Sequence, residues 1–217
     1  VYNDVYAETV EMFDDLLAVE VPAQKRIMLE KFNAYYNALT EEQIADLRAE
    51  DLPFDVYEDM LSKLYTVTFV ADGQTVISTT LYEGEAIVAP ESPVKAGNSI
   101  KAYKFVGWFN GELAFEEGAS ATRSVTYEAR YSTVYTQEYV AVAAALGELA
   151  SVAGGTLEER YTALSAIYGL MKTFSEENIA DAEAEGLSFA AYNELLAAYN
   201  ATAQGAAEDL KKAESLA

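Results

Sequence analysis

The residues with the most potential for acid–base chemistry are four pairs of adjacent glutamates. Such chemistry needs two carboxylates held several ångströms apart over a cleft, in environments that separate their pKa values. Adjacent residues on a helix diverge, and three of the pairs fall where we expect a helix to begin, so that the helix dipole explains their charge. We therefore expect the chain not to be an enzyme. The pairs are Glu41-Glu42, Glu116-Glu117, Glu158-Glu159 and Glu176-Glu177.

The composition removes most other catalytic and metal chemistry. The 217 residues include no Cys and no His, which excludes disulfides, thiol nucleophiles, Cys/His zinc sites and His-dependent triads. Asp72-Gly73 lacks the alternating oxygen ligands of an EF-hand, and Gly154-Gly155 lacks the Lys-Ser/Thr of a phosphate-binding loop and is interpreted as a linker. We predict no catalytic residue, no metal and no cofactor, and the binding residues stay unknown.

The charge of the chain limits its partners. Its formal charge is −22, with 36 acidic and 14 basic residues, and it would repel phosphate backbones and anionic lipid headgroups. No apolar run approaches the roughly 18 residues that a membrane span needs. We expect no nucleic-acid partner and no membrane insertion in this segment. We interpret the acidic residues as solvated outer faces rather than as a binding surface.

The chain contains an internal repeat. The stretch LTEEQIADLRAEDLPFDVYEDML from Leu39 recurs as FSEENIADAEAEGLSFAAYNELL from Phe174, at a constant offset of 135 residues (174 − 39). The similarity extends upstream of both stretches, so two copies of one module flank an unrelated middle. Apolar residues make up 51% of the chain, which is enough for packed cores.

Each copy is predicted to be a small helical bundle, because its apolar residues recur at i, i+4 and i+7. Pro22 suits the first turn of a second helix. Thr40, with Gln43 three residues later, forms the capping-box pattern that begins a third helix, and Pro53 opens a fourth. The second copy repeats the plan, with Ser175 in the capping position.

Between the copies, the repeat distance of the apolar residues changes from about 3.6 residues, typical of a helix, to two residues, typical of a strand. The runs YTVTFV and QTVISTTLY read as strands joined by a tight turn at Asp72-Gly73. KAYKFVGWF is a third strand, Asn110-Gly111 a second turn, and SVTYEARY a closing strand. The stretch 83–98, with two prolines, is expected to cross as a loop with at most a short helical turn. The sequence predicts an α+β, multi-module fold: two homologous small helical bundles flanking a β module.

The aromatic and glycine residues of the middle segment follow a particular order. A strand, a turn, a second strand and a Pro90/Pro93 loop precede the pattern Tyr-x-Phe-x-Gly-Trp, which ends at Trp108, and the last strand ends as Tyr-x-Ala-x-Tyr at Tyr131. At about residues 65–132 the chain thus resembles the Listeria-Bacteroides repeat, or internalin B-repeat. The resemblance implies a β-grasp-like module that serves as spacer or protein-interaction surface in secreted or wall-attached proteins of Gram-positive and related bacteria, without catalysis. The helical copies resemble no family that we recognise.

These features predict three independently folding segments. Residues 1–65 form the first helical bundle, residues 66–132 the β-grasp-like B-repeat, and residues 133–217 the second bundle with a C-terminal helical extension. Because the chain begins inside what reads as a helix, we expect it to be part of a longer protein.

Two functions fit. One is a non-catalytic modular region of a bacterial extracellular or cell-wall-attached protein, acting as spacer, display or adhesion modules toward a protein or glycan. The other is a carbohydrate-binding accessory region of a secreted glycan-degrading enzyme.

The aromatic residues have two competing interpretations. Sixteen tyrosines and one tryptophan can stack on sugar rings. Alternatively, Trp108 fills the β core while Tyr2, Tyr6, Tyr57 and their copies lie on the apolar faces of the helices, and we favour this core interpretation. Strand alternation further predicts that Phe105 and Trp108 lie on opposite faces of their strand.

Overall fold

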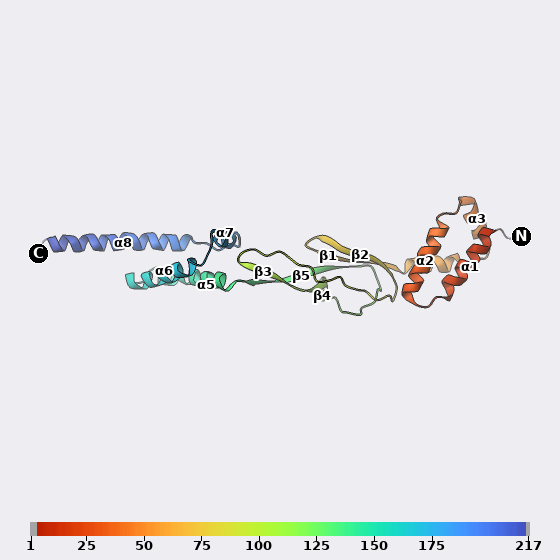
Figure 1. Ribbon diagram of the computed structural model, residues 1–217, viewed down its shortest axis with the longest axis horizontal. Coiled ribbons are helices and arrows are strands. Elements are labelled where there is room, and N and C mark those ends of the chain that lie inside the picture. The colour runs from red at the N-terminus through yellow and green to blue at the C-terminus, as the bar shows by residue number, and fades with distance from the viewer. Residues whose placement is uncertain (1–3, 216–217) are drawn as a thin grey trace. The chain divides into compact units, whose positions relative to one another are not determined.

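The computed structural model describes residues 4–215, with side chains up to residue 205 (Figure 1). This part of the chain is α+β, as predicted: four helices precede a five-stranded sheet and four helices follow it. Residues 1–3 and 216–217, at the ends of the first and third predicted segments, lie outside the described part. No helix within residues 4–215 is long and apolar enough to cross a membrane.

By spatial proximity the chain divides into two compact units. The first comprises residues 1–93 and 105–131, and the second comprises residues 94–104 and 132–217. The division into three independently folding segments stays a prediction.

The first four helices begin where local signals place them. Pro22 is the first residue of α2, and Pro53 directly precedes α4. Thr40 caps α3 through a capping box, in which the Gln43 amide N–H donates to Thr40 Oγ1 over 3.2 Å and the Thr40 N–H donates to Gln43 Oε1 over 2.8 Å. The predicted cap is therefore confirmed. The helices are α1 (Asp4–Ala18), α2 (Pro22–Tyr36), α3 (Glu41–Ala49) and α4 (Phe54–Ser62).

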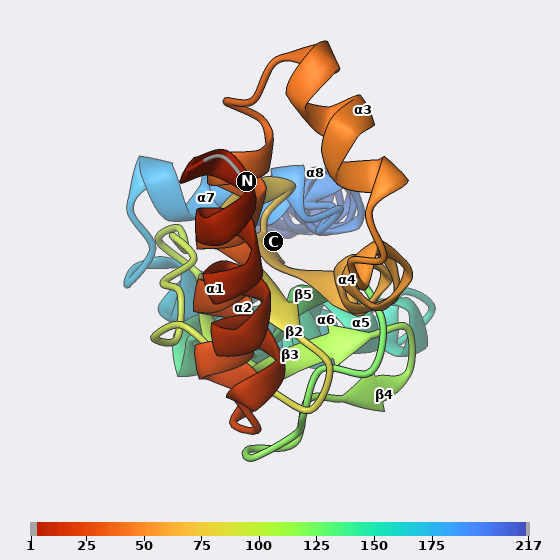
Figure 2. The same cartoon turned by 90° about the vertical axis from the view of Figure 1, so that its right-hand side faces the viewer.

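The apolar faces of these helices form one aromatic core. Helices α1 and α2 lie side by side (Figure 2), and the ring centroids of Phe13 and Phe32 are 4.5 Å apart. The ring of Tyr57 lies 4.6 Å from that of Phe32, which confirms Tyr57 as a core residue. Tyr82, from the sheet segment, also belongs to this core.

The sheet is mixed and has the strand order β2-β1-β5-β3-β4. β1 pairs antiparallel with β2 and parallel with β5, and β3 pairs antiparallel with β4. The predicted turn between β1 and β2 is confirmed, because Asp72 and Gly73 have φ angles of 49° and 76°, as a tight hairpin requires. The strands are β1 (Leu64–Ala71), β2 (Gln74–Tyr82), β3 (Lys101–Asn110), β4 (Leu113–Ala114) and β5 (Val125–Tyr135).

The link from β2 to β3 is held by hydrogen bonds to the segment before β5. The described residues 83–100 contain no helix, as predicted. The Gly84 N–H donates to the Ala121 carbonyl over 2.8 Å, and the Ile87 N–H donates to the Ala119 carbonyl over the same distance. Two irregular segments thereby satisfy each other's backbone groups.

Trp108 lies in the core of the sheet. Only 5% of its surface is exposed, and its ring meets Phe69 edge-on at 5.1 Å and Phe105 at 5.5 Å. The core interpretation is confirmed, but the prediction that Phe105 and Trp108 lie on opposite faces is wrong. The alternation breaks at Gly107, whose φ is 157°. A Cβ there would lie only 3.3 Å from the Phe109 ring.

The second set of helices repeats the first with one difference. Ser175 caps α7 through a capping box with Asn178, as predicted, and α7 has nine residues, like α3. The last helix runs for 26 residues, whereas its counterpart α4 ends at Ser62 and the chain enters β1. The predicted C-terminal helical extension is therefore present. The helices are α5 (Gln137–Val152), α6 (Leu157–Met171), α7 (Glu176–Ala184) and α8 (Ala190–Ser215).

The buried aromatic cluster gives a direct test of the sheet core. Phe69→Ala removes a side chain that is 2% exposed and should lower the free energy of unfolding by about 3–5 kcal/mol. Because Trp108 is the single tryptophan and contacts Phe69, its fluorescence during urea unfolding reports on this core alone.

Val106→Ala is the matched control, since Val106 is in the same strand and 58% exposed. It should change the free energy of unfolding by no more than about 0.5 kcal/mol. A Phe69→Ala protein with an unchanged midpoint, or red-shifted Trp108 emission in the native protein, would contradict the core assignment.

Candidate interaction sites

The four glutamate pairs are divided between helix starts and one loop. Three of them occupy the first turns of α3, α6 and α7, where the helix dipole stabilises negative charge. Glu159 also completes a capping box by accepting the Thr156 N–H over 2.7 Å, which lowers its pKa. The fourth pair lies in the link after β4. Within the described residues, no group of three or more acidic side chains is arranged to hold a metal ion.

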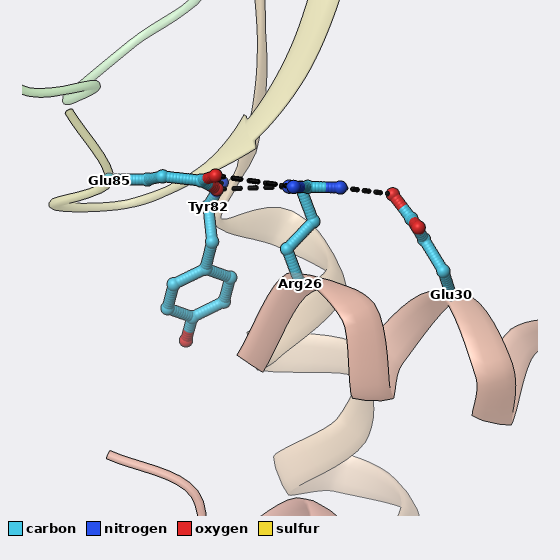
Figure 3. A network of polar contacts seen from close by, with 4 residues as sticks. All are labelled: Arg26, Glu30, Tyr82 and Glu85. Atoms are coloured by element: carbon cyan, nitrogen blue, oxygen red, sulfur yellow. Dashed lines mark hydrogen bonds and ion pairs between the residues drawn. The ribbon is translucent and has the colours of Figure 1, made fainter. Parts of the chain in front are cut away.

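A network of polar contacts joins α2 to the end of β2 (Figure 3). Arg26 Nε donates to Glu85 Oε2 over 3.0 Å, and Arg26 Nη1 donates to Glu30 Oε1 over 3.0 Å. Glu85 Oε2 also accepts the Tyr82 backbone N–H over 3.1 Å. The hydrogen bond to Glu85, followed by that to Glu30, raises the pKa of Arg26. We call Arg26, Tyr82 and Glu85 the first junction.

The first junction is partly shielded from water. The side chains of Arg26 and Glu85 are 23% and 12% exposed, and Tyr82 is 7% exposed. Burial raises the pKa of Tyr82. Lys25 Nζ lies 5.8 Å from the centre of the Tyr82 ring. Sequence reasoning missed this junction, because residues 59 apart with no shared motif give no signal of their pairing.

A second polar cluster joins α7 to the segment before β3. Asp181 Oδ2 accepts the Ser99 N–H over 2.9 Å and the Ser99 hydroxyl over 2.7 Å. Asn178 Nδ2 donates to the Ser99 carbonyl over 3.1 Å. Glu185 accepts hydrogen bonds from Lys101 and from the Tyr135 hydroxyl. We call Ser99, Lys101, Asn178, Asp181 and Glu185 the second junction.

Hydrogen bonding sets the pKa values in the second junction. The two bonds from Ser99 lower the pKa of Asp181, and the bond from Lys101 lowers the pKa of Glu185. The same contact raises the pKa of Lys101. The internal repeat indicated two of these residues, because Asp46 and Glu50 of the first copy recur as Asp181 and Glu185. It did not indicate their partners.

The two copies use these carboxylates differently. Asp46 and Glu50 are exposed on and after α3. In contrast, Asp181 binds Ser99 before β3, and Glu185 binds Lys101 at the start of β3. The first copy is attached to the sheet segment through α2 instead. Identical residues at one repeat offset thus carry a contact in one copy and face solvent in the other.

A groove in the second bundle gathers tyrosine side chains. It encloses about 310 Å³ between α6 and α8. Tyr161 and Tyr168 are 56% and 57% exposed, and the ring of Tyr199 lies 6.0 Å from that of Tyr161. The full lining is Tyr161, Leu164, Ser165, Tyr168, Tyr192, Leu196, Tyr199 and Asn200. The sequence predicted tyrosines on apolar helix faces but not this concentration around one hollow.

The first junction should contribute measurably to stability. A double-mutant cycle with Arg26→Ala and Glu85→Ala should give a coupling energy of about 1–2 kcal/mol, because the ion pair is partly buried and charge-assisted. The exposed pair Arg48–Glu58, at 2.9 Å with 47% and 57% exposure, is the control and should give less than about 0.5 kcal/mol. Equal couplings in urea unfolding would contradict a special role for the first junction.

The second junction should make stability depend on pH. The ordinary pKa values of Asp181 and Glu185 are 3.8 and 4.5, and both are lower in the folded protein. Their contribution is therefore fully present above these values and lost as the pH falls through the lower folded values. The thermal midpoint of D181N/E185Q should lie below that of the wild type at pH 7, and the gap should close as the pH falls below about 4.

The homologous variant D46N/E50Q is the control for this pH experiment. Its substitutions fall on exposed residues of the first copy, so the thermal midpoint should stay close to that of the wild type at pH 7. If both variants lose the same stability, general charge reduction rather than the second junction is responsible.

Comparison with known proteins identifies one part of the chain. No curated protein matches it. A family model does match residues 65–137, about a third of the chain and the stretch that forms the sheet. This agrees with the resemblance of residues 65–132 drawn from the order of the aromatic and glycine residues. The segment that forms the sheet, residues 65–137, matches the family model of the Listeria-Bacteroides repeat domain.

Proposed function

We propose that this chain is a non-catalytic modular region of a bacterial extracellular or cell-wall-attached protein, in which the modules act as spacer, display or protein-interaction (adhesion) units. The observation that carries the proposal is the Listeria-Bacteroides repeat at residues 65–137. Repeats of this family occur in bacterial surface proteins, which fits a non-catalytic surface module. The partner is a protein or a glycan at the cell surface.

The topology of the sheet supports a spacer role. β1 receives the chain from the first bundle, and its residues Val67–Val70 run parallel to Val125–Glu128 of β5. Because the first and last long strands point the same way, the chain enters the sheet at one end and leaves at the other. This connection is the one that the proposed spacer role requires. The order β2-β1-β5-β3, with a central parallel pair, also supports the proposed β-grasp-like fold.

The residue chemistry supports a non-catalytic role. The chain has no Cys and no His, and three of its glutamate pairs serve as first-turn residues of helices. Shifted pKa values elsewhere mark active sites, but in the two junctions the shifted groups are engaged with one another in hydrogen bonds.

The alternative is a carbohydrate-binding accessory region of a secreted glycan-degrading enzyme. Trp108 gives it no support, since a 5% exposed indole cannot act as a sugar platform. The tyrosine-lined groove between α6 and α8 does favour it.

The surface location is tested by labelling cells of the source bacterium with antibodies raised against this chain. Intact cells should be labelled, and brief protease treatment should remove the signal. Antibodies against a cytoplasmic protein are the control and should label only permeabilised cells. Labelling that requires permeabilisation would overturn the proposal.

A further inference from the structure

We propose that the groove between α6 and α8 binds a neutral saccharide, with the rings of Tyr161 and Tyr199 as its stacking platform. This inference goes beyond the spacer role and does not depend on it. Aromatic faces pack against the C–H faces of sugar rings, while nearby hydroxyl and amide groups fix the orientation. The groove offers both kinds of group, because Ser165 and Asn200 lie among its tyrosines.

The tyrosines at the rim are not required by the fold. At the repeat offset of 135 residues, Tyr161 and Tyr168 correspond to Arg26 and Asn33 of the first bundle. The first bundle forms the same helices with these polar residues. Tyr161 and Tyr168 leave more than half of their surface exposed, so bundle packing does not explain them.

In the first bundle, the sheet segment covers the face that corresponds to the groove. Arg26 there binds Glu85, and Tyr82 packs into the core of the bundle. In the second bundle, Tyr161 replaces Arg26, and the ion pair that holds the sheet segment has no counterpart. The face that carries a charged attachment in the first bundle is an aromatic groove in the second, which favours a different occupant.

The charge of the groove favours a neutral occupant. Its eight lining residues are uncharged, within a chain of formal charge −22 that repels anions. Lys172 Nζ lies 5.0 Å from the centre of the Tyr168 ring and covers one of its faces. We therefore assign the stacking to Tyr161 and Tyr199, whose ring planes are tilted by 34°, and a side position to Tyr168.

The size of the groove favours a saccharide over a protein partner. Its volume of about 310 Å³ lies at the lower end of the range for small-molecule sites, about 300–1,000 Å³. A stable protein interface covers about 800 Å² on each partner, which a hollow with eight lining residues does not provide. One or two sugar rings match the space and the polarity together.

The test is calorimetric titration of the full chain with neutral oligosaccharides at millimolar concentrations: cellohexaose, chitohexaose, maltohexaose and mannohexaose. Hexagalacturonic acid, which is anionic, is the charged counterpart and should not bind. At least one neutral oligosaccharide should bind, and Y161R/Y168N, which installs the residues of the first bundle, should weaken that binding by at least about tenfold.

Two further variants separate stacking from loss of fold. Y161F/Y168F keeps the rings and should retain binding within about threefold. Leu157→Ala, on the same helix but outside the groove lining, should leave binding unchanged. Circular dichroism should show the same helix content in all variants.

Absence of binding by all four neutral oligosaccharides, or equal binding by the wild type and Y161R/Y168N, would overturn the proposal. So would capture of a peptide by the groove with no saccharide competing for it. None of these three results bears on the surface location, which the antibody labelling tests separately.

Discussion

The parallel pairing of β1 with β5 is the constraint on which the arrangement of the sheet depends. Parallel neighbours cannot be joined by a tight turn, so the chain must leave β1, form a hairpin, cross through residues 83–100 and return through β3 before it reaches β5. The pair is fixed by packing as well as by backbone bonds. Phe69 and Tyr127 are opposite each other in the register, and their rings stack at 5.2 Å. Trp108 closes the cluster against Phe69.

What the sequence predicted was mostly local. The capping boxes at Thr40 and Ser175 and the turn at Asp72-Gly73 are formed by residues within a few positions of one another. All of the interactions that determine them can therefore be seen in a short stretch of sequence. The fold class, the core position of Trp108 and the repeat family followed from such windows taken together. The opposite-face assignment of Phe105 and Trp108 failed because strand alternation holds only for regular strands, and Gly107 interrupts this one.

The interaction sites were less predictable, because they are made of distant residues. Arg26 and Glu85 are 59 residues apart, and Ser99 and Asp181 are 82 apart. In the sequence, each of these residues has the features of an ordinary surface residue. Only the fold shows which partner it contacts. The tyrosine groove could be predicted in part. Its residues are visible as an aromatic excess, but only the packing of α6 against α8 shows that Tyr161 and Tyr199 meet.

The internal repeat separates what the fold requires from what it permits. Positions that keep their type in both copies, such as Tyr57 with Tyr192, are buried in the cores. Positions that differ between the copies, such as Arg26 with Tyr161, lie on the face that meets the sheet segment in one copy and lines the groove in the other. Asp46 and Asp181 form a third class, in which an identical residue is exposed in one copy and bound in the other. An exposed carboxylate without a contact stays hydrated and lowers the free energy of unfolding very little. The same residue can therefore stand in both copies, although only in the second copy does a neighbouring segment supply hydrogen-bond donors, those of Ser99.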